Sequence, residues 1–264
     1  MRIKRIIDEV SEAIFPSNIY CISCGSLIDR TRPYSLCDRC IRKMHWINDL
    51  RVCSKCGKAL QETFMGDRCY DCMLRSHYFT KGFSCLTYGL HEREIMMDIK
   101  YNSKGYLAVK MGDILYDRMR HELGSLDIGL IVPVPVSRER LKKRGYNQTA
   151  LMARQMRSRW VMDAPEENVP ETSEHILYRT RATIMLRSLN PAQRSLALEG
   201  AFAVKSGTED GIQGRNILLI DDIYTTGATC DSCSKALLEA GASKVYVLTL
   251  CSGGNRRPSD VDVR

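Results

Sequence analysis

Short apolar runs alternate with segments of helical spacing from residue 79 onward. Residues 128–135 and 217–220 are nearly continuous apolar runs, which are typical of strands buried on both faces of a parallel sheet. Residues 90–101 and 106–123 instead place their apolar side chains at the spacing of an amphipathic helix. Further strands are expected over 79–88 (as an edge strand or hairpin), 175–178, 201–204 and 244–250, and further helices over 147–160 and 228–240. This alternation predicts an α/β fold built on a parallel sheet.

The first 80 residues carry a cysteine repeat in place of this alternation. Four C-x-x-C pairs follow one another with 12 residues between successive pairs, namely Cys21/Cys24, Cys37/Cys40, Cys53/Cys56 and Cys69/Cys72. A C-x-x-C turn points two thiolates at one metal ion, and two turns complete a tetrahedral four-cysteine site without an open position for water. The repeat therefore predicts two structural Zn²⁺ sites. It also predicts two domains, an N-terminal helix with a double zinc ribbon over 1–80 and an α/β domain over 81–264.

The residues after the cysteines indicate how the pairs are shared between the two sites. Gly25 and Gly57 follow the first and third pairs, whereas Ile41 and Met73 follow the second and fourth, so the true repeat is 32 residues long. This favours one site from Cys21, Cys24, Cys37 and Cys40 and another from Cys53, Cys56, Cys69 and Cys72. Interleaved pairing is the alternative arrangement, and iron is the alternative metal. The alternative without a metal site is a set of reduced, metal-free cysteines.

The composition is that of a globular protein, with 44% hydrophobic and 27% charged residues. No apolar run approaches the roughly 20 residues that a membrane-spanning helix needs, and residues 1–10 lack the continuous apolar core of a signal peptide. A cytoplasmic location is therefore expected, where twelve cysteines indicate metal binding rather than disulfides. Eight thiolates and two Zn²⁺ together add four negative charges, so the formal charge of +8 falls to about +4. Overall charge thus gives little support for nucleic-acid binding.

The apolar run at 217–220 leads into the strongest chemical signal of the chain. Asp221 and Asp222 follow the run directly, and the segment 225–229 (Thr-Thr-Gly-Ala-Thr) precedes the expected helix. Free N–H groups at a helix N-terminus attract phosphate, and adjacent carboxylates can accept hydrogen bonds from ribose hydroxyls or help to hold a divalent cation. The alternative without a ligand site is an ordinary α/β strand that ends in two acids and is followed by a capped helix.

A basic segment follows the strand expected at 128–135. Five of the seven residues at 138–144 are Arg or Lys, and we expect them to form a loop that binds pyrophosphate, because guanidinium groups can bind it bidentately. Ser137, Arg138 and Arg144 are the candidate ligands in this loop. A solvated basic loop is the bland interpretation.

Residues 181–199 are polar and poorly periodic, and they contain Arg181, Arg187 and Arg194. A structureless segment of this length between two short strands is expected to be either a lid over the site or a linker.

The remaining four cysteines are expected to be packing residues. Cys230 and Cys233 form a further C-x-x-C, but their spacing places both on the core side of the helix after the phosphate turn. Cys85 and Cys251 lie in segments that resemble strands.

Residues 217–229 resemble the phosphoribosyl pyrophosphate (PRPP) signature of type I phosphoribosyltransferases, an apolar strand followed by two acids and Thr-Thr-Gly-x-Thr. The resemblance implies that Asp221 and Asp222 meet the ribose hydroxyls and that Mg²⁺ accompanies PRPP. It also implies that the 5′-phosphate is held by Thr225, Thr226, Gly227, Ala228 and Thr229.

The order of the motifs over nearly the whole chain resembles the ComF family. Tandem C-x-x-C pairs are followed by Pro133 and Pro135, by Arg-Gly-Tyr-Asn-Gln at 144–148, by a polar loop, and by the Asp-Asp signature. The resemblance implies a zinc ribbon joined to a type I phosphoribosyltransferase-like domain, and the handling of single-stranded DNA in the cytoplasm during natural competence. The polar loop departs from the family pattern, because Thr183 is followed by Ile-Met-Leu and Ala197 stands where asparagine is frequent.

These departures favour one of two functions. The first is PRPP binding combined with single-stranded DNA handling during DNA uptake, in which aromatic residues beside cations, such as Trp46 and Tyr146, stack on bases. The alternative is an active phosphoribosyltransferase that transfers the phosphoribosyl group to an unidentified acceptor and releases pyrophosphate. The altered loop weakens the case for transfer and leaves the phosphate turn untouched, so the first function is favoured.

Overall fold

The computed structural model describes residues 18–181 and 191–254 and divides into two compact units, one up to Met44 and one from His45. The first unit holds the 3₁₀ turn η1 (Pro33–Ser35) and the helix α2 (Asp38–Lys43). The second unit holds the sheet and also the second group of four cysteines. The domain boundary predicted near residue 80 marks the place in the sequence where the cysteine repeat ends and the α/β pattern begins. It stays a prediction. The expected N-terminal helix and the end of the chain lie outside the described residues.

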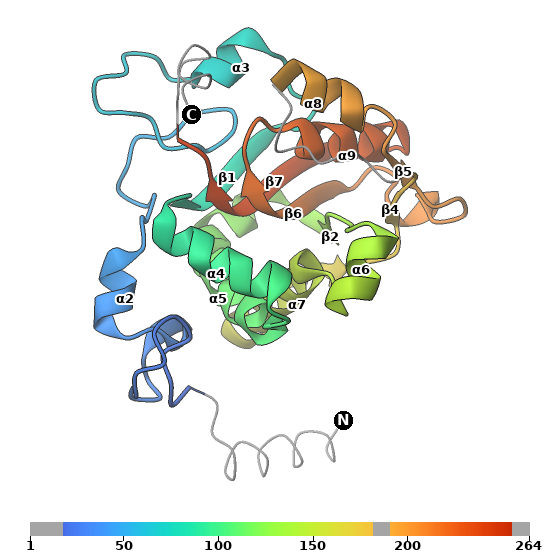
Figure 1. The fold of residues 1–264 in the computed structure, drawn as a ribbon. Helices are drawn as coiled ribbons and strands as arrows, with labels where there is room; N and C mark the ends of the chain where they lie inside the picture. The colour runs from blue at the N-terminus through green and yellow to red at the C-terminus, as the bar shows by residue number, and fades with distance from the viewer. Residues whose placement is uncertain (1–17, 182–190, 255–264) are drawn as a thin grey trace, which may run out of the picture. The chain divides into compact units, whose positions relative to one another are not determined.

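A five-stranded parallel sheet is the centre of the second unit (Figure 1). Its strand order is β1-β7-β6-β2-β3, and every neighbouring pair is parallel. The strands are β1 (Lys81–Thr87), β2 (Ile128–Pro133), β3 (Glu171–Thr172), β6 (Asn216–Tyr224) and β7 (Lys244–Ser252). The apolar residues of β6 at 217–220 are fully buried, because helices cover both faces of the sheet. β6 lies at the middle of the sheet, so its carboxyl end is flanked by β2 and β7.

Helices lie on both faces of this sheet (Figure 1). One face is covered by α5 (Gly105–Leu126) and α7 (Gln148–Asp163), and α4 (Leu90–Tyr101) packs on α5. The other face is covered by α9 (Ala228–Glu239), against which α8 (Pro191–Leu198) packs. Of the helices in the described ranges, none combines the length and apolar composition that a membrane crossing needs. The remaining elements are α3 (Tyr70–Leu74), α6 (Arg138–Arg144), the antiparallel pair β4 (Leu177–Arg179) and β5 (Phe202–Val204), and η3 (Glu209–Gly211).

The predicted α/β class is confirmed, a parallel sheet covered by helices and preceded by a cysteine-rich region that forms four-cysteine clusters. The expected edge strand is β1, and the helix expected at 90–101 has the same bounds in the structure. The two-residue β3 was missed, because so short a strand leaves no pattern in the sequence.

Two predicted loops are wrong in part. The basic segment at 138–144 is the helix α6, which Ser137 caps by accepting a hydrogen bond from the Arg140 amide at 3.3 Å. The segment 181–199 is not structureless throughout, since α8 occupies its second half. Helix α8 packs on α9, and this tertiary contact supports a helix that local composition did not indicate. Thr183 to Leu186 and Arg187 lie outside the described residues.

Candidate functional site

The turn between β6 and α9 is shaped by a glycine. Gly227 caps α9 with a φ of +82°, and a Cβ atom at this position would lie 2.4 Å from the Tyr224 Oη. Glycine is therefore required here by both conformation and space. The turn leads directly into the 12-residue helix α9, whose first N–H groups have no acceptor within the helix and lie at its positive end.

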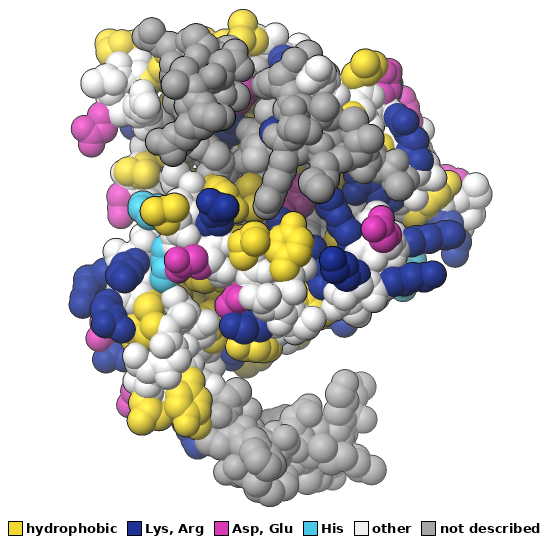
Figure 2. Space-filling model, viewed as in Figure 1, with side chains coloured by type: hydrophobic (Ala, Val, Ile, Leu, Met, Phe, Trp, Pro, Cys, Tyr) yellow, Lys and Arg dark blue, Asp and Glu magenta, His cyan; other side chains and the backbone are white. Residues whose placement is uncertain are grey.

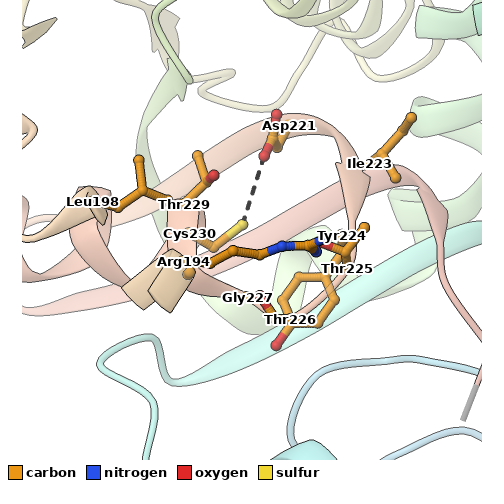
Figure 3. Close-up of a pocket in the computed structure, with 11 residues that line it drawn as sticks. Arg194, Leu198, Asp221, Ile223, Tyr224, Thr225, Thr226, Gly227, Thr229 and Cys230 are labelled. Carbon is orange, nitrogen blue, oxygen red and sulfur yellow. Dashed lines mark hydrogen bonds between the residues drawn. The ribbon is translucent and has the colours of Figure 1, made fainter. Parts of the chain in front are cut away.

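A small cavity of about 50 Å³ lies at this turn, which is room for a phosphate group or a few water molecules (Figure 3). Arg194 of α8 extends across it, and its guanidinium donates a hydrogen bond to the Thr225 hydroxyl at 3.4 Å. The cavity is lined by Arg194, Leu198, Asp221, Ile223, Tyr224, Thr225, Thr226, Gly227, Ala228, Thr229 and Cys230. It thus combines a helix N-terminus, threonine hydroxyls and a guanidinium, a set of groups suited to a phosphate ester.

The structure brings together some of the predicted site residues and not others. Asp221 and the five residues of the 225–229 turn line the cavity with Arg194. Asp222, Ser137, Arg138 and Arg144 are not among its described lining residues.

Asp221 is a buried carboxylate beside the cavity, only 8% exposed. It accepts hydrogen bonds from the backbone amide of Asp222 at 2.8 Å and from the thiol of Cys230 at 3.9 Å (Figure 3). Burial, followed by the negative charge of Asp222, raises the pKa of Asp221 to about 7. A ribose hydroxyl or a cation that reached this carboxylate would favour its charged form.

Asp222 faces the other side of the sheet, because neighbouring residues of a strand point to opposite faces. Its carboxylate lies 2.9 Å from the Lys100 ammonium and accepts a 2.6 Å hydrogen bond from the Gln148 amide. Arg144 donates to the Gln148 side chain and, at 3.0 Å, to the Lys100 carbonyl. Burial by itself would raise the pKa of Asp222, but the charge and hydrogen bond of Lys100 and the bond from Gln148 together lower it.

The two adjacent acids therefore have different environments. Asp221 lines the cavity, whereas Asp222 holds β6 to α4 and α7 through Lys100 and Gln148. Sequence reasoning missed Lys100, because a lysine near the end of an amphipathic helix gives no local signal of a partner on a distant strand. Gln148 and Arg144 stood out in the sequence as parts of the basic segment, but their structural role was not expected.

The remaining cations of α6 form an exposed basic surface. Arg138, Arg140, Lys142 and Lys143 are all exposed, whereas Arg144 is half-buried. Lys and Arg side chains gather where α6 lies in Figure 1 (Figure 2). We call these four exposed residues the α6 basic surface.

Of the two aromatic residues that were candidates for base stacking, Tyr146 is bonded to the protein through its side chain and Trp46 through its backbone. Tyr146 donates a 2.6 Å hydrogen bond from its hydroxyl to the Ile99 carbonyl, and Trp46 is half-buried and bridges to Leu86.

The first eight cysteines form two clusters in the sequential pairing. Within each cluster all four sulfur atoms lie within 4.8 Å of one another. The clusters are alike in detail, since the Cys37 amide donates to the Cys21 sulfur at 3.4 Å and the Cys69 amide donates to the Cys53 sulfur at 3.2 Å. Four thiolates without a histidine or carboxylate fit a closed, structural Zn²⁺ site in each cluster. The other four cysteines, Cys85, Cys230, Cys233 and Cys251, are buried in the core as expected.

Comparisons with known proteins agree with this architecture. A family model described as a double zinc ribbon domain matches residues 10–73. Competence protein F of Haemophilus influenzae is 27% identical over 233 residues, 87% of this chain and 95% of that protein. DNA utilization protein YhgH of Escherichia coli K12 is 27% identical over 221 residues, 83% of this chain and 90% of that protein. Competence protein ComFC of Bacillus subtilis is 36% identical over 122 residues, 46% of this chain and 43% of that protein.

Among solved structures, the glutamine PRPP amidotransferase of B. subtilis aligns with a TM-score of 0.35 and 14% identity. The alignment covers 58% of this chain and 30% of that one.

Proposed function

The chain belongs to the ComF family, and from this premise we propose that it binds PRPP with Mg²⁺ at the β6–α9 turn and handles single-stranded DNA during DNA uptake. The observation that carries the proposal is the cavity in which Asp221, the 225–229 turn and Arg194 meet. In this proposal the turn holds the 5′-phosphate, Asp221 accepts from a ribose hydroxyl, and Arg194 pairs with a phosphate oxygen. The names of the relatives support a role in competence and DNA utilization, and a cytoplasmic location is part of the proposal.

Phosphoribosyl transfer is the second candidate. It is supported by the raised pKa of Asp221, because a carboxylate that titrates near neutrality can stabilise positive charge on the ribose or move a proton at physiological pH. The described residues of the cavity include no second carboxylate and no histidine, so they do not identify an acceptor.

Gly227→Ala is expected to weaken PRPP binding at least tenfold. The new Cβ atom would meet the Tyr224 hydroxyl at 2.4 Å, and a φ of +82° is strained for alanine, so the turn has to change shape. Calorimetric titration with PRPP and Mg²⁺ measures the loss. Pyrophosphate release in the same samples, screened over bases and amines, separates binding from transfer.

Gly207→Ala is the matched control. Gly207 has the same φ of +82°, but a Cβ atom there would meet nothing within 4 Å, so this variant carries the backbone strain without the clash. We expect it to keep the affinity of the wild type. If the wild type shows no heat of PRPP binding, or if the two alanine variants bind equally well, the proposed phosphate site is wrong.

Lys142→Gln/Lys143→Gln is expected to weaken single-stranded DNA binding in a way that depends on salt. Each lost phosphate contact lowers the slope of log affinity against log salt by roughly 0.7, so the double variant should lower it by about 1.4. Lys81→Gln/Lys244→Gln is the control, because these exposed lysines lie at the amino ends of β1 and β7, away from the carboxyl edge of the sheet. Gel shifts over a salt series that give equal slopes for the two pairs would contradict a role of the α6 basic surface.

A further inference from the structure

The two cysteine clusters differ in what they pack against. The second cluster belongs to the same compact unit as the sheet, and all four of its cysteines are buried. They share one apolar core with Phe79 and with Tyr224, Ala228 and Cys230, which lie in the 225–229 turn or directly beside it. The first cluster lies in the other unit, and its Cys24 is exposed.

Tyr224 joins the second cluster to the underside of the turn. Its ring, 1% exposed, meets Phe79 edge-on with the ring centroids 6.1 Å apart, and the Lys58 ammonium lies 5.5 Å from its centroid. Lys58 follows the Cys53/Cys56 pair, and it forms a 2.6 Å ion pair with Asp71, which lies between Cys69 and Cys72. The hydroxyl end of the same ring lies against Gly227. Tyr224 Oη has no hydrogen-bond partner within the described ranges, so the ring is positioned by packing and by the Lys58 ammonium.

Asp231 provides a second link, in the first turn of α9. It accepts hydrogen bonds from the ring of His77 at 2.7 Å and from the backbone amide of Tyr78 at 3.1 Å. The His77 side chain is fully buried and stacks on Phe79, with the ring centroids 4.9 Å apart. His77 and Tyr78 follow the α3 helix of the second cluster, so the chain that leaves the cluster holds the helix whose N-terminus faces the cavity.

The cluster is also seated closely on the sheet. A Cβ atom at Gly57 would lie 2.5 Å from the Gly82 carbonyl of β1, and the Gly82 amide donates to the Lys55 carbonyl at 2.8 Å. Two backbones in such close contact cannot move independently of each other, because packed interiors have little free space.

We propose that the second four-cysteine site is a part of the phosphate site: a metal ion held by Cys53, Cys56, Cys69 and Cys72 positions the 225–229 turn through Tyr224 and Asp231. A C-x-x-C knuckle depends on its metal ion for its fold, so metal occupancy controls the support beneath the turn. Linkage then requires the reverse effect, in which a ligand on the turn tightens metal binding at the second site. The identity of the ligand rests on the proposed function, whereas the mechanical link does not.

The 32-residue repeat supplies a matched pair of variants in the full chain. Cys69→Ser/Cys72→Ser disrupts the second site, and Cys37→Ser/Cys40→Ser disrupts the equivalent positions of the first. Each is expected to lose one of two zinc ions. In the absence of ligand, amide hydrogen exchange of residues 224–231 should become at least tenfold faster in the second-site variant and stay unchanged in the first-site variant. Equal exchange of these amides in both variants would overturn the proposal, whether or not the protein binds PRPP.

A second measurement keeps the second site intact, because the second-site variant is at risk of unfolding. In the first-site variant, which retains only the second site, PRPP with Mg²⁺ should slow zinc transfer to a chelator at least fivefold. Asp231→Ala, introduced into the first-site variant, removes the His77 and Tyr78 hydrogen bonds while it leaves the second cluster complete, and should reduce this protection at least threefold. If PRPP binds by calorimetry but leaves zinc transfer unchanged, the coupling is wrong although the proposed function holds. If PRPP does not bind, the proposed function fails, and the exchange experiment alone decides the link.

Discussion

Asp221→Asn should stabilise the folded protein at pH 8 by about 2–4 kcal/mol and at the same time weaken PRPP binding. The stabilisation is expected because burial, followed by the charge of Asp222, raises the pKa of Asp221 from 3.8 to about 7. At pH 8 the folded protein therefore holds an ionised carboxylate in a site that disfavours its charge, and asparagine removes this cost. The amide oxygen of asparagine still accepts the 2.8 Å bond from the Asp222 amide.

The pH dependence of this effect has a definite sign. Between about pH 4 and pH 7 the folded state binds more protons at Asp221 than the unfolded state, so ionisation of this group lowers stability as the pH rises through that window. The gain from Asp221→Asn should vanish below pH 4 and reach its full size above pH 7. Urea unfolding at pH 4 and pH 8 measures it. A loss of stability at pH 8, or a gain of equal size at both pH values, would contradict the environment assigned to Asp221.

Asp222→Asn should have the opposite effect and destabilise the protein by about 2–4 kcal/mol at pH 8. The substitution leaves the Lys100 ammonium without its 2.9 Å partner and removes the charge that attracts Arg144, whose own pKa is lowered by burial. Lys100 keeps 20% of its side chain exposed, so water recovers part of the loss. Because the pKa of Asp222 is lowered in the folded state, the stability that it contributes is present above pH 4 and is lost as the pH falls further.

A second substitution tests the cause of this destabilisation. Lys100→Met in the Asp222→Asn background removes the unpaired cation and should recover at least half of the lost stability, whereas Lys100→Met alone should destabilise. Urea unfolding of the four proteins completes a double-mutant cycle. Additive losses would show that Lys100 and Asp222 do not interact and that the destabilisation has another cause. The adjacent acids thus offer two isosteric substitutions with opposite expected signs.

The opposite roles of these neighbours explain why a buried charge with a raised pKa persists beside a stabilised one. Proteins keep unfavourable groups where a ligand needs them and compensate elsewhere in the fold. In the proposed function Asp221 has this character, since its site disfavours the charge that a ribose hydroxyl or a cation would stabilise. Asp222 holds the strand that carries it.

Local patterns were sufficient for most of the elements of the sheet and for the cysteine repeat. The apolar run at 217–220 and the spacing at 90–101 depend only on which faces of one element are buried, so they could be recognised without the rest of the fold. Gly25 and Gly57 favoured the sequential pairing of the cysteines over the interleaved one, and the structure has the sequential pairing. The candidate phosphate turn was likewise evident, since a short run of residues forms it.

Contacts between distant segments decided the rest. The sequence could not indicate that Asp221 and Asp222 have different partners, because the difference arises from Lys100 and Gln148 on separate helices. It could not place α8, whose helix depends on packing against α9, nor bring Arg194 to Thr225. It did not show that the second cysteine cluster packs beneath the phosphate turn, because that contact is made by Tyr224 and Asp231 across the core. Periodicity and short motifs indicate the burial and the turn type of one segment. The hydrogen-bond and ion-pair partners of a side chain, its pKa and the contacts that hold a turn in place arise only when distant segments pack together.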